Sequence, residues 1–169
     1  MYRSNFMNDK FEKKVKNIYR EIIDQLNTMI PDEWSTVYVN AEIYNDGGTV
    51  YFFYQSNKNN EIYYSLEIHD LYYISEETFD ELDFKLYETF KKLCLLFDNE
   101  SQNKWTTCEL VITSEGKLKS EFGYTNWKKA EFGPGDRLNY FKYKYLGELP
   151  SNEYEIQKLY EMKEFIDNL

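Results

Sequence analysis

Residues 37–54 read VYVNAEIYNDGGTVYFFY, and apolar side chains alternate with other residues on both sides of a central turn. Alternation with a period of two places every second side chain on the same face of a β-strand. The apolar positions are Val37, Val39, Ala41 and Ile43 before the turn and Val50, Phe52 and Tyr54 after it. The residues 46–48 between them, Asp-Gly-Gly, tolerate the positive φ angles of a tight turn. This stretch therefore predicts an antiparallel hairpin.

The same alternation recurs in two later segments of the chain. After the polar loop Asn57–Asn60, apolar residues at 62, 64, 66 and 68 predict a third strand that completes a meander. Further along, Cys108, Leu110 and Ile112 alternate, Glu115-Gly116 forms a turn, and residues 118–122 return as a second hairpin. We therefore predict a sheet of about five antiparallel strands.

Helical periodicity flanks these strands. Apolar residues recur at three- and four-residue steps between Asn8 and Ile30, where Pro31 ends the pattern. Ser75 can cap a second helix that runs to about Asp98, and Ser151 or Asn152 can cap a third. Residues 123–147 lose the pattern, and because Gly133-Pro134-Gly135 breaks a helix we expect a structured loop there, with at most one short helix.

Helices around adjacent strands, without β-α-β alternation, indicate an α+β fold in which an N-terminal, a central and a C-terminal helix pack on an antiparallel sheet. The 169 residues suit one domain, residues 1–169, with residues 1–7 flexible. Composition agrees, since 42% of the residues are hydrophobic and 19% aromatic, which is too apolar for disorder.

The formal net charge of −10 opposes direct binding to nucleic acid or to anionic membranes. Neither a signal peptide nor a run of about 20 apolar residues is present, so we expect a cytoplasmic protein. Cys94 and Cys108 lie in apolar, patterned segments without metal-ligand spacing and are expected to be reduced core residues.

Residues that carry chemistry are nearly absent. His69 is the single histidine, the seven glycines form no phosphate-binding loop, and the carboxylates of residues 76–88 follow the exposed faces of a helix. We predict no catalytic residue, no metal ligand and no cofactor. A small enzyme or ligand-binding domain that uses Glu42, His69 or a buried carboxylate remains the rival class, and a deep polar pocket would favour it.

Tyrosines on both sides of the predicted strands form a further feature. Tyr38, Tyr51 and Tyr63 alternate out of phase with the residues assigned to the core. Helices on both faces of the sheet, or tyrosines rimming the core, would explain them. A protein-binding surface, where Tyr and Trp are enriched, explains them equally well.

Several short motifs follow one another in a characteristic order. In the first two thirds of the chain they are Met29–Trp34, Val37-Tyr38, Ala41-Glu42, Tyr73–Ser75, Trp105–Glu109 and Glu115–Lys119. The last third is the most specific, with Trp127, Glu131–Gly133, Arg137, Asn139-Tyr140, Tyr143-Lys144, Leu149-Pro150 and Glu153–Ile156. In order and spacing, over nearly the whole chain, these motifs resemble the YezG-like (EsaG-like) immunity proteins, antitoxins against type VII-secreted nuclease toxins, and in particular the staphylococcal-type branch.

The resemblance implies an antitoxin that binds the nuclease domain of a toxin and catalyses nothing. We expect the free protein to be a monomer or a weak dimer. One segment departs from the family pattern. Residues 122–127, FGYTNW, lack the acidic residues expected around the tyrosine before the tryptophan. This departure is expected either of an immunity protein matched to a variant toxin or of a surplus immunity copy.

The expected partner-binding residues lie in the irregular loop, because such loops often carry function on a rigid scaffold. They are Tyr124, Trp127, Glu131, Arg137 and Tyr140. For Trp127 and Tyr140, closing the core is an equally good explanation. Within the binding class, an alternative is that the acidic clusters mimic a DNA backbone, which strong loss of affinity with added salt would indicate.

Overall fold

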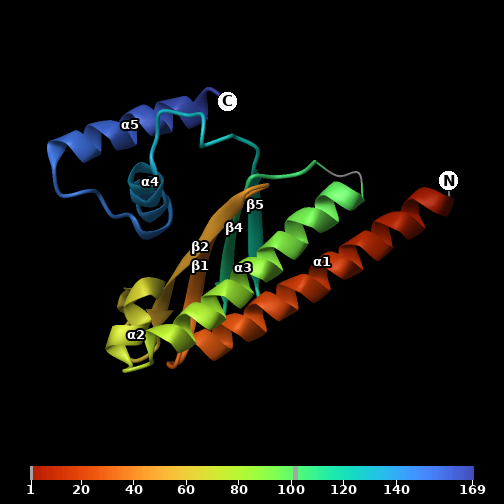
Figure 1. Ribbon diagram of the computed structural model, residues 1–169, viewed down its shortest axis with the longest axis horizontal. Helices are drawn as coiled ribbons and strands as arrows, with labels where there is room; N and C mark the ends of the chain where they lie inside the picture. The colour runs from red at the N-terminus through yellow and green to blue at the C-terminus, as the bar shows by residue number, and fades with distance from the viewer. Residues whose placement is uncertain (1, 101–102) are drawn as a thin grey trace. The chain divides into compact units, whose positions relative to one another are not determined.

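The computed structural model describes residues 2–100 and 103–169, with side chains described from residue 9 onward (Figure 1). Its sheet has five antiparallel strands in the order β3-β2-β1-β4-β5. The strands are β1 (Trp34–Tyr44), β2 (Gly47–Ser56), β3 (Ile62–Tyr64), β4 (Thr107–Thr113) and β5 (Leu118–Gly123). The predicted α+β class, with a meander and a second hairpin, is confirmed.

Two long helices cover one face of this sheet, α1 (Tyr2–Met29) and α3 (Glu76–Asn99). Val39 pairs with Phe52 on one side and Leu110 on the other, so their side chains share the face under the helices. All three are buried, together with Leu26 of α1 and Phe90 of α3. Burial of the apolar stripes of both helices against the sheet therefore forms one core.

α1 begins at Tyr2, six residues before its predicted start, and Ile30 lies just beyond its last residue. Met1 lies outside the described residues, and the flexibility expected for residues 1–7 stays a prediction. Cys94 and Cys108 are buried free thiols, as predicted. Among the described residues no helix is long and apolar enough to cross a membrane.

Ser75 caps α3, since its hydroxyl accepts the backbone N–H of Thr78 at 3.1 Å. Replacing a serine cap by alanine leaves that N–H without its partner. We expect Ser75→Ala to lower the free energy of unfolding by about 1 kcal/mol, measured by urea denaturation. Ser151→Ala is the control, because Asn152 and not Ser151 caps α5 (Glu153–Asp167), accepting the N–H of Glu155 at 2.9 Å. Equal losses in both variants would contradict the assignment of the cap.

The third predicted strand was too long. β3 ends at Tyr64, and the chain continues as a 3₁₀ helix η1 (Ser65–Glu67) and the short helix α2 (Ile68–Leu71). The ladder ends because the side chain of Ser65 accepts the N–H of Phe52 at 3.2 Å, where a strand would have supplied a backbone carbonyl.

The faces of β3 were also assigned wrongly. Tyr63 pairs with Tyr54 and thus faces the helices, whereas Tyr64 pairs with Phe53 on the opposite face. There the rings of Phe53 and Tyr64 stack with centroids 4.7 Å apart, and Tyr51 contacts both edge-on. Tyr51 and Tyr38 lie on the face away from the helices, as predicted.

The chain divides into two compact units by its internal contacts, the first ending at Tyr124 and the second covering Thr125–Leu169. The second contains α4 (Pro134–Leu146) and α5, which pack on each other. It has buried apolar residues of its own, including Leu159 and Met162. A single domain over residues 1–169 stays a prediction.

The one helix allowed for within residues 123–147 is longer than expected, because the second half of this stretch forms the 13-residue helix α4. Gly133-Pro134-Gly135 begins this helix instead of breaking it, because proline at the first helical position sacrifices no intrahelical hydrogen bond. The carboxylate of Asp136 accepts the N–H of Gly133 at 2.8 Å, and Gly147, at φ +68°, ends the helix.

Candidate partner-binding surface

The five residues predicted to contact a partner are divided between the two units. Tyr124 is the last residue of the first unit and is exposed. Trp127, Glu131, Arg137 and Tyr140 belong to the second, where Arg137 and Tyr140 lie on α4 and not in the irregular loop where we expected them. That these residues bind a partner stays a prediction.

Trp127 and Arg137 take part in the packing of the second unit. The buried Trp127 ring contacts Phe132 and Phe165, with centroids 6.4 and 5.8 Å away. Nη1 of Arg137 donates to the carbonyl oxygen of Phe132 at 2.8 Å. These contacts support the alternative that Trp127 closes a core. Glu131 is exposed, and the ring of Tyr140 lies 6.5 Å from that of Tyr143.

Negative charge is concentrated in residues 59–84, which we call the acidic segment. It contains eight of the 30 Asp and Glu residues and none of the 20 Lys and Arg residues, so the rest of the chain carries a formal charge of only −2. The segment comprises β3, η1, α2 and the first turns of α3, all in the first unit. Its carboxylates are Glu61, Glu67, Asp70, Glu76, Glu77, Asp80, Glu81 and Asp83.

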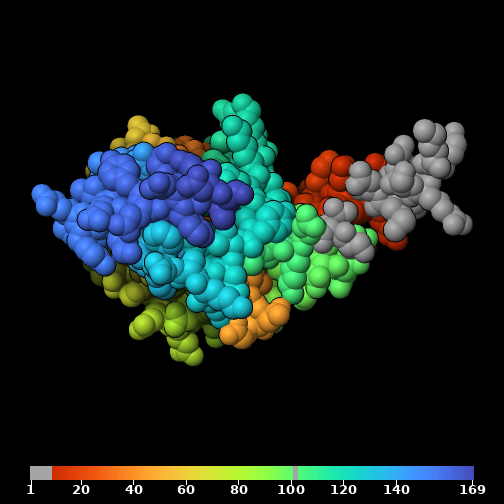
Figure 2. All heavy atoms as spheres, turned by 90° about the horizontal axis from the view of Figure 1, so that it is seen from above, coloured from red at the N-terminus to blue at the C-terminus, as the bar shows by residue number. Residues whose placement is uncertain are grey.

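Large apolar side chains are exposed within the acidic segment. Tyr73 is 96% exposed, Phe84 61%, and Leu66 and Leu71 about half. Figure 2 shows the yellow-green atoms at the end of α2 and the start of α3 at the molecular surface. Phe84 has Asp80, Glu81 and Glu88 as neighbours at helical spacing. We call Leu66, Leu71, Tyr73 and Phe84 the exposed apolar set.

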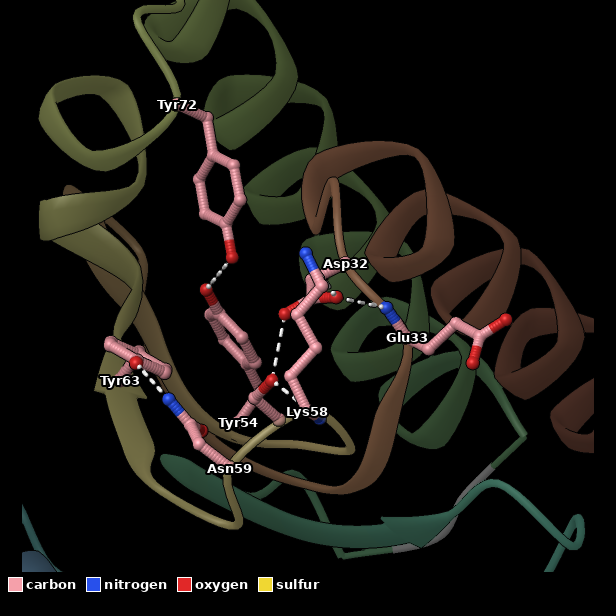
Figure 3. Close-up of polar contacts among 8 residues, drawn as sticks. Asp32, Glu33, Tyr54, Lys58, Asn59, Tyr63 and Tyr72 are labelled. Atoms are coloured by element: carbon pink, nitrogen blue, oxygen red, sulfur yellow. Dashed lines mark hydrogen bonds and ion pairs between the residues drawn. The ribbon is translucent and has the colours of Figure 1, made fainter.

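The turn before α3 points two successive tyrosines in opposite directions. Tyr72 extends inward, and its hydroxyl lies 3.0 Å from that of the buried Tyr54 (Figure 3). Burial, and then the hydrogen bond to Tyr72, raise the pKa of Tyr54 far above its usual value. Tyr73 follows at φ +53°, a left-handed conformation that costs energy in any residue with a Cβ. The backbone N–H of Ile74 then donates to the carbonyl of His69 at 3.1 Å and closes the turn.

Asp32 fixes the neighbouring part of this region. It accepts the hydroxyl of Ser56 at 2.7 Å and the N–H of Glu33 at 2.9 Å, and Lys58 lies 3.9 Å away (Figure 3). The bond from Ser56 is the largest cause of a lowered pKa for Asp32. These contacts connect the end of β2 to the segment between α1 and β1.

Asp83 has a perturbed carboxyl group, because burial and then the charge of Asp80 raise its pKa from 3.8 to about 6. The folded chain thus binds this proton more tightly than the unfolded chain, so its free energy of unfolding falls as pH rises from about 4 to about 6. We expect Asp83→Asn to raise the free energy of unfolding by about 1 kcal/mol at pH 7.5, after allowance for partial solvent exposure. Near pH 3.5 the substitution should leave it unchanged. Urea denaturation at both pH values measures this.

Glu81→Gln serves as control, since Glu81 is an exposed carboxylate on the same helix. A gain at pH 3.5, or an equal gain in the control at pH 7.5, would contradict the assigned cause.

Glu42 and His69, the residues named for an alternative enzyme or ligand-binding site, do not meet at a polar pocket. The His69 ring lies 6.2 Å from Phe79, and its Nδ1 lies 3.3 Å from a carboxylate oxygen of Asp70. Glu42 is on β1, opposite Thr49 and Thr107. A groove of about 690 Å³ runs between α1 and α3, but neither residue lines it. Among the described side chains, those of residues 9–100 and 103–169, no three Asp, Glu, His or Cys residues are placed to hold a metal ion.

Charges along the α1–α3 groove largely pair with each other. Nζ of Lys92 lies 2.9 Å from Glu21, and Nζ of Lys14 lies 2.7 Å from Glu100. This surface therefore presents no excess of one sign, in contrast to the acidic segment.

Sequence reasoning missed the exposed apolar set. Leu66 was assigned to the buried face of a strand, and Tyr73 was noted only as part of a family-like motif. Two signals were present in the sequence: Phe84 falls outside the apolar stripe of its helix, and no Lys or Arg occurs between Lys58 and Lys85.

Comparison with known proteins identifies related chains. A family model described as "Immunity protein YezG-like" matches residues 15–160. The chain is 42% identical over 159 residues to the type VII secretion system protein EsaG of Staphylococcus aureus, covering 94% of this chain and 98% of that relative. It is 31% identical to the immunity proteins YezG of Bacillus spizizenii and Bacillus subtilis, over 83% and 82% of this chain and 87% and 92% of those relatives.

Proposed function

Because the chain belongs to the YezG-like family of immunity proteins, we propose that it binds and neutralises the nuclease domain of a toxin exported by a type VII secretion system. The observation that carries this proposal is the near full-length match to a type VII secretion system protein. The protein acts by stoichiometric binding in the cytoplasm of the producing cell, without a catalytic residue or cofactor of its own.

The charge distribution supports a protein partner of opposite sign. A nuclease domain that binds DNA needs a basic surface for the phosphate backbone. An acidic immunity protein is attracted to that surface and is repelled by the DNA itself. Binding there, or beside it, excludes the DNA substrate or holds the nuclease in an inactive conformation.

Direct mimicry of DNA is a second candidate, favoured by the carboxylates of Glu76, Asp80 and Asp83, which recur along α3 at three- and four-residue steps. In that case the carboxylates occupy the phosphate positions of the nuclease cleft. Tyr124 and Glu131, the most exposed of the residues expected from the sequence, remain candidates for additional contacts.

Co-expression with the toxin encoded beside this chain tests the proposal. We expect the nuclease domain to co-purify with the chain in a one-to-one complex and the purified complex to leave plasmid DNA intact. A nuclease variant without activity, expressed in parallel, shows whether complex formation depends on catalysis. Recovery of both proteins separately, with DNA cleavage undiminished, would refute the proposal.

A further inference from the structure

We propose that the exposed apolar set within the acidic segment is the face that docks on the nuclease domain, with Tyr73 as its central anchor. This inference rests on the proposed function and adds to it the surface of the immunity protein that makes the contact. The set comprises Leu66, Leu71, Tyr73 and Phe84, all in the first unit.

Exposure of these four side chains has no explanation in the folding of the first unit. Tyr73 has nearly its whole side chain in water, and Phe84 lies on the side of α3 away from the buried Leu86 and Phe90. Large aromatic and aliphatic side chains that are exposed within one short stretch of a folded unit are typical of protein contacts, where Tyr contributes more binding energy than most residues. The apolar set is therefore suited to a protein partner.

Charge identifies the kind of partner. The acidic segment, which contains the apolar set, has eight carboxylates and no Lys or Arg. Lys58, at its edge, lies 3.9 Å from Asp32. A partner surface that covers the set must compensate this negative charge, so we commit to a surface rich in Lys and Arg, as the DNA-binding face of a nuclease is.

The backbone holds Tyr73 in place before any partner binds. Tyr72 is joined to Tyr54 through their hydroxyls, Ile68 is completely buried, and Ile74 packs against the core. The exposed residue is thus flanked by anchored ones. A residue whose backbone is already held in one conformation loses less backbone entropy on binding than one on a mobile loop.

Isothermal titration with an inactive nuclease domain of the adjacent toxin tests the surface. We expect Tyr73→Ala with Leu71→Ala to raise Kd about 30-fold or more, the effect of losing a central hot spot. Tyr154→Ala is the matched control, because Tyr154 is a 70% exposed tyrosine on α5 and should leave Kd unchanged.

Tyr73→Gly separates binding from folding. Glycine adopts the left-handed conformation of residue 73 without cost, so this variant should melt at the same or a higher temperature than the parent chain while binding weakly. A loss of binding that accompanies a lower melting temperature in both Tyr73 variants would overturn the proposal.

The inference and the proposed function can fail separately. Full affinity in both Tyr73 variants, with affinity lost in Tyr124→Ala or Glu131→Gln, would overturn this surface and leave the antitoxin role intact. If the parent chain itself does not bind the nuclease domain, both are refuted.

Discussion

Replacement of Phe90 by alanine is expected to lower the free energy of unfolding by about 3–5 kcal/mol, the range for truncating a buried Phe. Phe90 is 0% exposed and belongs to the core formed by α1, α3 and the sheet. Its removal withdraws buried apolar area and leaves a cavity in this core. Since small domains are stabilised by about 5–15 kcal/mol in total, much of the stability should be lost. Urea denaturation followed by circular dichroism measures the change.

Phe84→Ala is a closely matched control for this prediction. It makes the same chemical change on the same helix, but at a side chain that is mostly exposed. We expect a change within about 0.5 kcal/mol. Comparable losses for Phe84 and Phe90 would show that α3 does not bury the face described above. The control also tests docking, because Phe84→Ala should weaken nuclease binding without weakening the fold.

Neutralising four carboxylates of the acidic segment is expected to slow association with the nuclease domain at least tenfold at low ionic strength. The variant combines Glu76→Gln, Glu77→Gln, Asp80→Asn and Glu81→Gln, which halves the formal charge of the segment. Because salt screens interactions between exposed charges, the difference from the parent chain should shrink at about 1 M salt, where the Debye length is about 3 Å. Stopped-flow measurement of the association rate at several salt concentrations gives both quantities.

The control variant neutralises four acidic residues of α5, namely Glu153, Glu155, Glu161 and Glu164. It should retain most of the association rate if the location of the charge matters more than its total. The dissociation rate distinguishes the two modes of inhibition. If the carboxylates only steer the nuclease toward an apolar docking face, the variant of the acidic segment should dissociate from it at a nearly unchanged rate. If they mimic DNA, its dissociation rate should increase strongly. Equal slowing in both four-residue variants would contradict the assignment of charge to this segment.

Local pattern was sufficient to predict the central hairpin. Residues 37–54 contain their own alternation and their own turn, and the observed pairing of Val39 with Phe52 joins positions that the pattern had placed on one face. The first helix and α3 were equally predictable, because their apolar stripes match the helical period over about five turns.

Elements that depend on one side-chain contact were not predictable in this way. Residues 62–68 alternate like a strand, but the hydroxyl of Ser65 takes the place of a ladder carbonyl and the chain turns into η1. Gly133-Pro134-Gly135 is compatible with a helix break or a helix start, and the contact from Asp136 to Gly133 shows which occurs. The contact of Ser65 with Phe52 depends on tertiary geometry, which the sequence pattern does not contain, whereas the contact of Asp136 with Gly133 is a local helix cap.

The candidate docking surface, likewise, was predictable from the sequence only in part. The acidic segment is visible in the sequence as a long stretch without Lys or Arg. Tyr72 and Tyr73, however, are adjacent and chemically identical, so no pattern could show which of them is exposed. The positive φ of Tyr73 and the contact between Tyr72 and Tyr54 distinguish them.

Titration of DNA cleavage tests the central claim most directly, namely that this chain inhibits a nuclease by binding it. The purified chain is added in steps to a fixed concentration of the active nuclease domain, well above Kd, and the cleavage rate of plasmid DNA is recorded. We predict a linear fall to complete inhibition at one molar equivalent. Cleavage that continues at full rate in the presence of a tenfold excess would contradict the account.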